Sequence, residues 1–252
     1  MRLEIVLNSQ EKIKLPYSYN HLLQGFIYTL FDSALRKFLH NQGFLYEKRK
    51  FKFFCFSRLF GRFEKQDDTI SFIPPVRFFL SSPKGEILQS LVEGLIKREE
   101  LFLGRNKVFL ETIKILPKLS FDNETIIKML SPITIYSTLK EDRGSKKTHY
   151  YSPYEERFSD LIKENLRKKY TALFNEEIKD IDFNIMPFKV SNSDQKVILY
   201  KKQKTNQAKP TVIKAWMGLY KIQGDPRLIE LSYDCGLGAK NSQGFGMWER
   251  IG

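Results

Sequence analysis

The sequence has few cysteines and no long apolar run. Its 252 residues include two cysteines, Cys55 and Cys235, which stand far apart with no second thiol or histidine at a ligand spacing. We therefore expect neither a disulfide framework nor a structural zinc site. No apolar run approaches the roughly 20 residues that span a bilayer, and the first residues lack the apolar core of a signal peptide. The sequence thus predicts a soluble cytoplasmic protein.

Glycine and proline are not enriched, and acidic residues are fewer than basic ones. The chain has 14 glycines and 10 prolines, while aromatic residues make up 14% of it, a composition that excludes collagen-like and disordered proteins. Hydrophobic residues make up 42%, enough for a core in one large domain or two ordinary ones. Against 29 acidic residues stand 42 lysines and arginines, so the net charge is +13. Such a surface favours a polyanion, and DNA, RNA and membrane lipid are all compatible with it.

Hydrophobic periodicity in the first half indicates alternating strands and helices. Apolar residues at period two predict a strand at Leu3–Leu7, and apolar residues three and four apart predict one long helix at Tyr19–Leu39, which Asn41-Gln42-Gly43 ends. The remaining expected elements are strands at Phe51–Phe56, near Thr69–Ile73 and at Val108–Ile115, turns at Gly61 and Asp67-Asp68, and a helix after Pro83. The order strand, helix, strand, strand, helix, strand is the ferredoxin-like arrangement.

The second half repeats this order more loosely, without a sequence repeat of fixed period. Its expected elements are strands at Ile133–Leu139, Phe183–Val190, Val212–Gln223 and Met247–Ile251, and helices at Tyr154–Leu173 and Pro226–Asp234. The polar segment Pro117–Glu124 is the candidate linker, which divides the chain into domains of residues 1–118 and 125–252. The predicted fold class is therefore α+β, with tandem ferredoxin-like domains and a glycine-rich loop near the C-terminus.

The most distinctive run lies between residues 236 and 246. Four glycines bracket a polar insert: Gly236, Gly238, Gly244 and Gly246 surround Lys240, Asn241 and Ser242. Glycine lets backbone N–H groups approach a phosphate closely. A dinucleotide-binding motif would need a third glycine at Asn241, and an NTP-binding loop would need Gly-Lys-Ser/Thr at Gly244, so neither motif fits. A glycine-rich hairpin between the last helix and the last strand is the structural alternative.

This run resembles the C-terminal glycine-rich loop of the CRISPR-associated RAMP proteins, and among them of the repeat-processing endoribonucleases, the sixth Cas family. Other segments are also similar to that family: Leu15–Asn20, Leu23–Tyr28, Leu39–Gly43, Phe51–Ser57 and Ser131–Ile133. The resemblance implies tandem ferredoxin-like domains related to the RNA-recognition motif, with a groove between them that binds CRISPR repeat RNA. It also implies RNA contacts by the glycines and polar residues of the glycine-rich run.

RNA can be cut without a metal ion when its own 2′-hydroxyl attacks the adjacent phosphate, which leaves a 2′,3′-cyclic phosphate and a 5′-hydroxyl. The reaction needs proton transfer, for which an imidazole with an unperturbed pKa of roughly 6.5 is suited, and cations or hydroxyls that stabilise the charge on the phosphate. The chain has three histidines and no clustered set of Asp and Glu, so two-metal hydrolysis is the weaker mechanism. We expect neither a metal nor another cofactor.

His40 is the expected general acid or base. On its position alone it could simply complement the C-terminal end of the first long helix, but the resemblance places the family's catalytic histidine there. The resemblance implies Tyr28 and Lys52 as its partners. Tyr28 precedes His40 by twelve residues, about 18 Å along a straight helix, so the helix breaks, His40 swings on the loop, or Tyr28 belongs to the core. Tyr46 is the alternative hydroxyl. The other two histidines, His21 and His149, rank lower.

Two basic segments are candidate RNA contacts. Between Asn41 and Arg62 basic residues are interleaved with aromatic ones, and the expected contacts are Lys48, Arg49 and Lys50. Between Lys189 and Lys214 a second run surrounds a polar hairpin tip, where the expected contacts are Lys201, Lys202 and Lys204. The alternatives are core phenylalanines in the first segment and a solvated loop in the second. A groove lined by these cations should bind RNA with a strong dependence on salt.

The sequence thus predicts a metal-independent endoribonuclease that processes CRISPR repeat RNA. A non-cleaving, RNA-binding RAMP subunit of a CRISPR effector complex is the alternative, and the basic surface and the glycine-rich run fit both. The residues do not decide between a monomer and a homodimer, nor whether the chain joins an effector complex. No membrane partner is expected.

Overall fold

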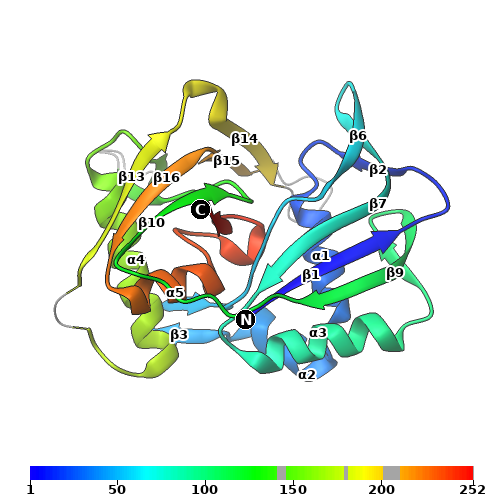
Figure 1. Cartoon of the computed structure of the whole chain (residues 1–252), viewed down its shortest axis with the longest axis horizontal. Helices are drawn as coiled ribbons and strands as arrows, with labels where there is room; N and C mark the ends of the chain where they lie inside the picture. Colours follow the sequence, from blue (N-terminus) through cyan, green and yellow to red (C-terminus); the bar gives the residue numbers. More distant parts are fainter. Residues whose placement is uncertain (141–145, 179–180, 201–210, 252) are drawn as a thin grey trace.

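The computed structural model describes residues 1–140, 146–178, 181–200 and 211–251 (Figure 1). The predicted contacts Lys201, Lys202 and Lys204 lie outside the described residues. Over the described part, no helix is long and apolar enough to cross a membrane. Each half of the chain builds its own antiparallel sheet, and the loop that precedes the last strand lies between the two halves (Figure 1).

The first sheet has its strands in a ferredoxin-like order. β1 (Arg2–Asn8) lies between β7 (Thr69–Ser81) and β9 (Asn106–Ile115), antiparallel to both. Shorter strands pair with β7 or β9, and these are β2 (Ile13–Pro16), β5 (Cys55–Phe56), β6 (Phe60–Gln66) and β8 (Leu101–Leu103). The order expected for the first half is confirmed, but β6, and not the expected strand Phe51–Phe56, is the main partner of β7 on this side. Gly61, however, lies inside β6 and makes no turn there.

Two helices, α1 (Asn20–Leu30) and α3 (Gly85–Lys97), share one core with this sheet. The expected apolar face of β1 is confirmed, because its alternate residues Leu3, Ile5 and Leu7 are all buried. α1 and α3 approach each other closely at Gly94, where an added Cβ would lie 1.9 Å from the Leu30 carbonyl oxygen. Glycine at this position therefore allows the helix pair to cover the sheet.

The long helix expected at Tyr19–Leu39 is two helices, α1 and α2 (Ser33–Asn41). Between them the backbone is extended, and the carboxylate of Asp32 caps α2 by accepting a hydrogen bond from the Leu35 backbone N–H at 2.9 Å. The apolar residues keep helical spacing through the break, so periodicity alone does not reveal it. Because of the break, α2 does not have to continue along the axis of α1.

The strand expected at Phe51–Phe56 is also interrupted. Its first residue belongs to a separate hairpin, whose strands are β3 (Phe44–Tyr46) and β4 (Arg49–Phe51). After it, Phe53 has a φ of 49°, which breaks the alternation of a strand. Phe53 is buried in the core of the second half and Phe54 in the core of the first. Because these two neighbours are buried in different cores, this segment ties the two cores together.

The second sheet also has a ferredoxin-like order. Its antiparallel strands follow the order β13 (Phe183–Lys189), β16 (Leu219–Gly224), β10 (Glu124–Met129) and β17 (Trp248–Arg250). Its helices are α4 (Arg157–Phe174) and α5 (Pro226–Cys235), whose buried residues share a core with these strands. Both expected helices are confirmed. The strands expected at Phe183–Val190 and Met247–Ile251 are also confirmed, as β13 and β17.

The first strand of this sheet was expected in the wrong place. β10 begins at Glu124, inside the expected linker. The segment Ile133–Leu139 forms one isolated bridge, from Ile133 to Trp216, and then joins a separate hairpin, whose strands are β11 (Tyr136–Lys140) and β12 (Lys146–Tyr150). β10 begins with two polar residues followed by two isoleucines, so it lacks the regular alternation by which periodicity identifies a strand.

The single strand expected at Val212–Gln223 is also two strands. Gly218, with a φ of 105°, separates β15 (Thr211–Trp216) from β16. β15 turns away from the sheet and pairs with β14 (Gln195–Tyr200). A glycine within an apparent strand is the signal for such an interruption.

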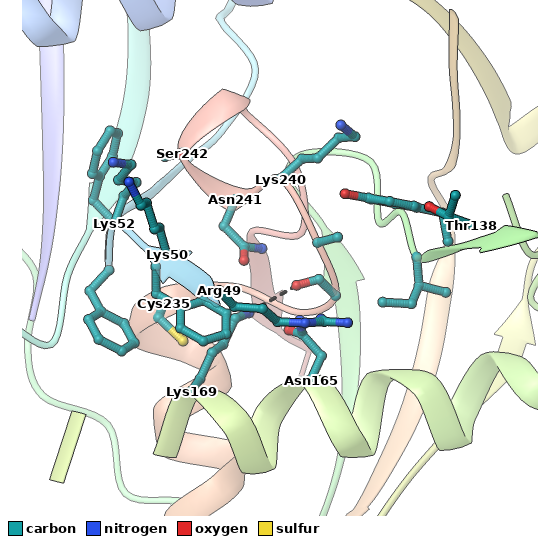
Figure 2. Close-up of a pocket in the computed structure, with 17 residues that line it drawn as sticks. Arg49, Lys50, Lys52, Thr138, Asn165, Lys169, Cys235, Lys240, Asn241 and Ser242 are labelled. Atoms are coloured by element: carbon teal, nitrogen blue, oxygen red, sulfur yellow. Dashed lines mark hydrogen bonds between the residues drawn. The ribbon is translucent and has the colours of Figure 1, made fainter. Parts of the chain in front are cut away.

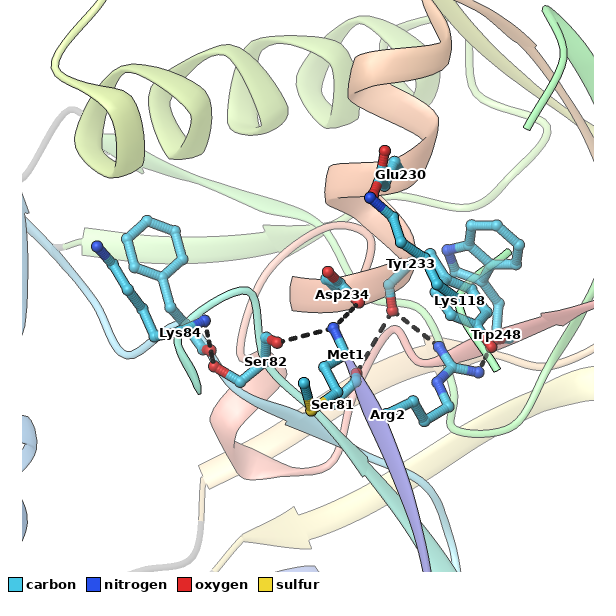
Figure 3. A network of polar contacts seen from close by, with 11 residues as sticks. Met1, Arg2, Ser81, Ser82, Lys84, Lys118, Glu230, Tyr233, Asp234 and Trp248 are labelled. Carbon is cyan, nitrogen blue, oxygen red and sulfur yellow. Dashed lines mark hydrogen bonds and ion pairs between the residues drawn. The ribbon is translucent and has the colours of Figure 1, made fainter. Parts of the chain in front are cut away.

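A buried arginine joins the two halves (Figure 3). Arg2, from β1, is 3% exposed, and its guanidinium donates to the carbonyl of Trp248 at 2.7 Å and to the carbonyl of Tyr233 at 2.8 Å. The guanidinium carbon lies 3.5 Å from the centre of the Tyr233 ring. Burial lowers the pKa of Arg2, and the carbonyls and the ring compensate its charge. The ammonium group of Met1 reaches across the same junction to Asp234 at 2.7 Å.

Candidate functional site

Two adjoining cavities lie where the halves meet. The larger cavity, about 880 Å³, is lined mainly by α1 and α2. The smaller cavity, about 440 Å³, is lined by the β3–β4 hairpin, α4, β11 and the glycine-rich loop (Figure 2). Lys52 and Ser242 line both cavities, so the two spaces meet at these side chains.

The larger cavity brings together the three residues expected to act in catalysis. Tyr28 comes from α1, His40 from the last turn of α2, and Lys52 from the segment after β4. Of the alternatives for Tyr28 and His40, the structure has the break in the helix, and it also packs Tyr28 against the core of the first half. Tyr46, the alternative hydroxyl, lines neither cavity and accepts a hydrogen bond from Arg167 at 3.1 Å.

His40 is exposed at the end of α2. Its Nδ1 lies 2.7 Å from the side-chain oxygen of Asn41. An amide oxygen accepts hydrogen bonds and does not donate them, so this contact places the proton of a neutral imidazole on Nδ1. Nε2 is then the acceptor nitrogen, the atom suited to take a proton from a substrate hydroxyl.

Two lysines are held against the end of α2. Lys52 Nζ donates to the His40 carbonyl at 3.3 Å, and Lys50 Nζ donates to the Asn41 carbonyl at 2.7 Å. Cations are stabilised at a helix C-terminus, where carbonyl groups are free to accept. Partial burial, together with the nearby charge of Lys50, lowers the pKa of Lys52. Lys52 is thus a cation fixed next to His40, and it loses its proton more readily than an ordinary lysine.

Tyr28 is partly buried at the wall of the larger cavity. Its ring meets Phe31 and Phe54 edge to face, each at 5.7 Å between ring centres. Burial raises the pKa of Tyr28 to about 12. The hydroxyl therefore keeps its proton at neutral pH and can act there as a hydrogen-bond donor.

The glycine-rich loop runs from the end of α5 to β17 and contains a short 3-10 helix, η2 (Asn241–Gln243). Its four glycines are buried and have positive φ. The values are 82° for Gly236, 65° for Gly238, 83° for Gly244 and 80° for Gly246. An added Cβ at Gly246 would lie 1.9 Å from the Leu237 carbonyl oxygen. Of the four, Gly238 lines the smaller cavity, beside the expected contacts Lys240, Asn241 and Ser242.

Side chains from both halves hold this loop. From α1, Asn20 donates to the carbonyl of Gly244 at 3.2 Å and Gln24 donates to the carbonyl of Ser242 at 2.6 Å. From α4, Lys169 donates to the carbonyls of Gly236 and Gly238, at 2.7 and 3.0 Å. The Asn241 amide bonds within the loop, to the carbonyls of Leu237 and Phe245. The loop is therefore a rigid wall shared by the two cavities.

The remaining predicted contacts lie around the smaller cavity. Arg49 and Lys50 are exposed on β4 and line it, whereas Lys48 sits on the exposed turn of the same hairpin. Lys240 Nζ lies 5.0 Å from the centre of the Tyr136 ring, and both residues line this cavity.

The other two histidines have different surroundings. His21 lines the larger cavity, with Nδ1 at 3.0 Å from the Ser18 carbonyl oxygen. His149, on β12, lies outside both cavities at 2.9 Å from the Glu155 carboxylate. Over the described residues, no group of three or more His, Cys, Asp or Glu side chains is placed to hold a metal ion.

Several cavity residues were not predicted. Arg36 and Lys37 line the larger cavity one turn before His40 on α2, and that helical spacing could have identified them. Tyr200, on β14, also lines it and donates a hydrogen bond to Gln24. In the smaller cavity, Asn165 and Lys169 come from α4. No local signal marks them, since the pattern of α4 shows only that they face inward.

Two family models together match almost the whole chain. Residues 14–114 match the one described as CRISPR-associated protein Cas6, N-terminal, and residues 115–250 match the one described as CRISPR associated protein Cas6, C-terminal. A curated relative, CRISPR-associated endoribonuclease Cas6 1 of Methanocaldococcus jannaschii, is 32% identical over 253 residues, which cover 98% of this chain and 91% of the relative.

Solved structures share the fold. One described as CRISPR associated protein Cas6 has a TM-score of 0.79 and 31% identity, covering 100% of this chain and 99% of the other. Another, described as an RAMP protein binding different RNA substrates, has a TM-score of 0.82 at 23% identity and covers all of both chains. The predicted fold class of tandem ferredoxin-like domains is confirmed.

Proposed function

The chain belongs to the Cas6 family of CRISPR-associated endoribonucleases, and on this premise we propose that it cuts CRISPR repeat RNA by attack of the RNA's own 2′-hydroxyl. The observation that supports the proposal is that Tyr28, His40 and Lys52 line one cavity although they come from three separate segments. Such a site supplies an acid–base group, a hydroxyl donor and a cation, which this reaction needs at one phosphate.

In this proposal His40 acts as the general base. The contact of Nδ1 with Asn41 leaves Nε2 to accept the proton of the 2′-hydroxyl. The 2′-oxygen then bonds to phosphorus, the bond from phosphorus to the 5′-oxygen breaks, and the leaving oxygen takes a proton from solvent. Lys52 neutralises the charge that builds on the phosphate, and the Tyr28 hydroxyl donates a hydrogen bond that orients it. The products are a 2′,3′-cyclic phosphate and a 5′-hydroxyl.

The RNA would reach this site through the groove between the two halves, which we take as domains of residues 1–118 and 125–252. Six cationic side chains line the two cavities near the surface, namely Arg36, Lys37, Arg49, Lys50, Lys52 and Lys240. Phosphates paired with these cations would hold a single strand across both cavities. We further propose that any homodimer or effector complex leaves this groove open to RNA.

The test uses purified protein and a repeat RNA in EDTA, beside the same RNA with a 2′-deoxy nucleotide at the cleavage position. We expect cleavage of the all-ribose RNA in EDTA, products with cyclic phosphate ends, and no cleavage of the deoxy RNA. A requirement for magnesium, or cleavage of the deoxy RNA, would contradict the chemistry. Binding of cognate repeats without any cleavage would favour a non-catalytic RNA-binding subunit.

The lowered pKa of Lys52 leads to a prediction for alkaline pH. Because burial and Lys50 lower this pKa, Lys52 loses its charge at a lower pH than an ordinary lysine, and the cleavage rate should fall there. Arginine keeps its charge throughout, so Lys52→Arg should move the alkaline fall to higher pH, whatever rate it loses near neutrality. Tyr28 does not obscure this fall, since its pKa is about 12. Single-turnover rates from pH 6 to 10 measure the fall, with Lys48→Arg as the control. If the wild type and Lys52→Arg lose activity over the same alkaline range, the role of Lys52 is refuted.

The cationic lining leads to a prediction for salt. If all six cations neutralise phosphates, the logarithm of the RNA association constant should fall against the logarithm of salt concentration with a slope of about −4. Arg36→Ala should make that slope shallower by about 0.7. Lys97→Ala is the control, because Lys97 pairs with Glu93 on α3, away from both cavities. Fluorescence anisotropy titrations measure the slopes, and a flat response would contradict the proposed groove.

A further inference from the structure

The smaller cavity contains a buried asparagine that the cleavage chemistry does not use. Asn165, on α4, is 5% exposed and lines the cavity, and its side-chain oxygen is buried without a hydrogen-bond partner. A buried amide oxygen without a partner is costly to folding, so such an atom is rare unless a ligand completes its hydrogen bonding. Figure 2 shows Asn165 projecting from α4 into the cavity.

A buried lysine lies one helical turn further along the same face of α4. Lys169 is 2% exposed and donates to the carbonyls of Gly236 and Gly238. These two bonds leave one of the three ammonium N–H groups for a further acceptor. Asn165 and Lys169 together offer the cavity both an acceptor and donors at its floor (Figure 2).

The walls of this cavity suit a flat ring. The Tyr136 ring forms part of the wall, with the Lys240 ammonium 5.0 Å from its centre. Phe51 and Phe53 form another part and stack on each other at 5.8 Å. Aromatic side chains bind unstacked RNA bases through their faces, while hydrogen bonds read the base edge.

We propose that the smaller cavity binds one unstacked base of the RNA, adjacent to the cleaved phosphate, and that Asn165 reads the edge of that base. The proposal rests on the proposed cleavage of repeat RNA and names how the same site recognises its substrate. The adjacent position follows from Lys52 and Ser242, which line both cavities. The mouth carries Arg49 and Lys50, which are placed to neutralise the phosphates on either side of the base.

Adenine is a base that fits this floor. Its amino group donates to an amide oxygen while a neighbouring ring nitrogen accepts from the amide N–H, the pairing by which asparagine recognises adenine. A free phosphate or carboxylate would attract Lys169 but has no N–H to donate to the unpartnered oxygen of Asn165. The orphan acceptor therefore selects a base over a simple anion.

The test couples a protein change to a base change. Asn165→Ala should fold as well as the wild type, because it removes a buried amide oxygen that has no partner and because alanine favours helix. A set of repeat RNAs would carry an abasic site at each of the three nucleotides on either side of the cleaved phosphate. We expect one abasic position to lower kcat/KM of the wild type by about tenfold or more, and Asn165→Ala to lower it similarly on intact RNA. When Asn165→Ala cleaves the RNA with that abasic site, the loss of kcat/KM should be about as large as either single loss and not their product.

Chemical replacement of that base tests the identity of the edge. Purine riboside, which lacks the amino group of adenosine, should cost the wild type as much as Asn165→Ala does and cost the variant nothing more. The matched control is Asn184→Ala, since the Asn184 side chain accepts from Ser159 at 2.7 Å outside both cavities. Losses that multiply at every position, or full activity of Asn165→Ala on intact RNA, would overturn the proposal.

The dissociation constants of the same RNAs separate this proposal from the proposed cleavage. If the wild type binds repeat RNA but does not cut it, the cleavage chemistry is refuted, while coupling between Asn165 and one base in the dissociation constants still supports the base site. If the wild type cuts repeat RNA and neither rates nor dissociation constants show that coupling, the base site alone is refuted.

Discussion

Replacing His40 by alanine should lower the single-turnover rate of repeat-RNA cleavage by about 10²- to 10⁴-fold, the usual contribution of a general acid or base. RNA affinity should stay near that of the wild type, because His40 is an exposed side chain among many cationic contacts. In the proposed mechanism its imidazole accepts the proton, through the nitrogen that the contact with Asn41 leaves available. Removing it leaves Tyr28 and Lys52 in place, so substrate positioning and charge stabilisation persist without proton transfer. Quenched-flow or manual time courses at saturating protein, with a separate binding titration, make the measurement.

His149→Ala is the matched control for this prediction. His149 also has a polar partner and is partly exposed, but it pairs with Glu155 outside both cavities. Its replacement should leave the cleavage rate within about twofold of the wild type. A His40→Ala variant that cuts as fast as the wild type would remove His40 from the chemistry. The next residue to test would then be His21, the other histidine that lines the larger cavity.

Replacing Gly246 by alanine should destabilise the protein by more than about 3 kcal/mol and abolish RNA binding. The residue has a φ of 80°, a region that costs an L-residue roughly 1–2 kcal/mol, and the new Cβ would lie 1.9 Å from the Leu237 carbonyl oxygen. Relief of this clash must move the backbone, because the Leu237 N–H donates to the Gly246 carbonyl at 2.8 Å and the Gly246 N–H donates to Pro132. The loop wall shared by both cavities would then be lost. Urea unfolding and RNA titration measure the two effects.

Gly85→Ala is the control for the loop prediction. Gly85 begins α3, and nothing lies within 4 Å of a Cβ added there. This substitution should be neutral or slightly stabilising, because alanine restricts the unfolded chain more than glycine does. If Gly246→Ala unfolded at the same urea concentration as Gly85→Ala, the packing argument for the glycine-rich loop would be wrong.

The order of elements could be predicted because burial leaves a periodic trace. Leu3, Ile5 and Leu7 alternate in β1, and the buried faces of α4 and α5 repeat at helical spacing. Interruptions leave a weaker trace. The cap residue Asp32 marked the start of α2, but the apolar spacing that continued across it predicted a single helix. The positive φ of Phe53 had no local signal, because the contacts that impose it come from both cores.

The site was predictable only as far as a family resemblance reached. His40, Tyr28 and Lys52 were expected from it, and the structure places all three around one cavity. Arg36 and Lys37 could have been added from helical spacing alone. Asn165 and Lys169 could not, because segments distant in the sequence form the cavity that they line, and Lys169 bonds to a loop some 70 residues later in the chain. Such long-range contacts are visible only in the folded molecule.

Arg2 also sets an order of events during synthesis. Its hydrogen-bond partners Tyr233 and Trp248 follow it by 231 and 246 residues. At about 5–20 residues per second, a ribosome needs roughly 12–50 s to add the residues between Arg2 and Trp248. During that time the guanidinium has no native carbonyl to which it can donate a hydrogen bond, so it must stay hydrated. We therefore expect the two halves to dock only as the last strand emerges, so the cleft between them is the final part of the molecule to form.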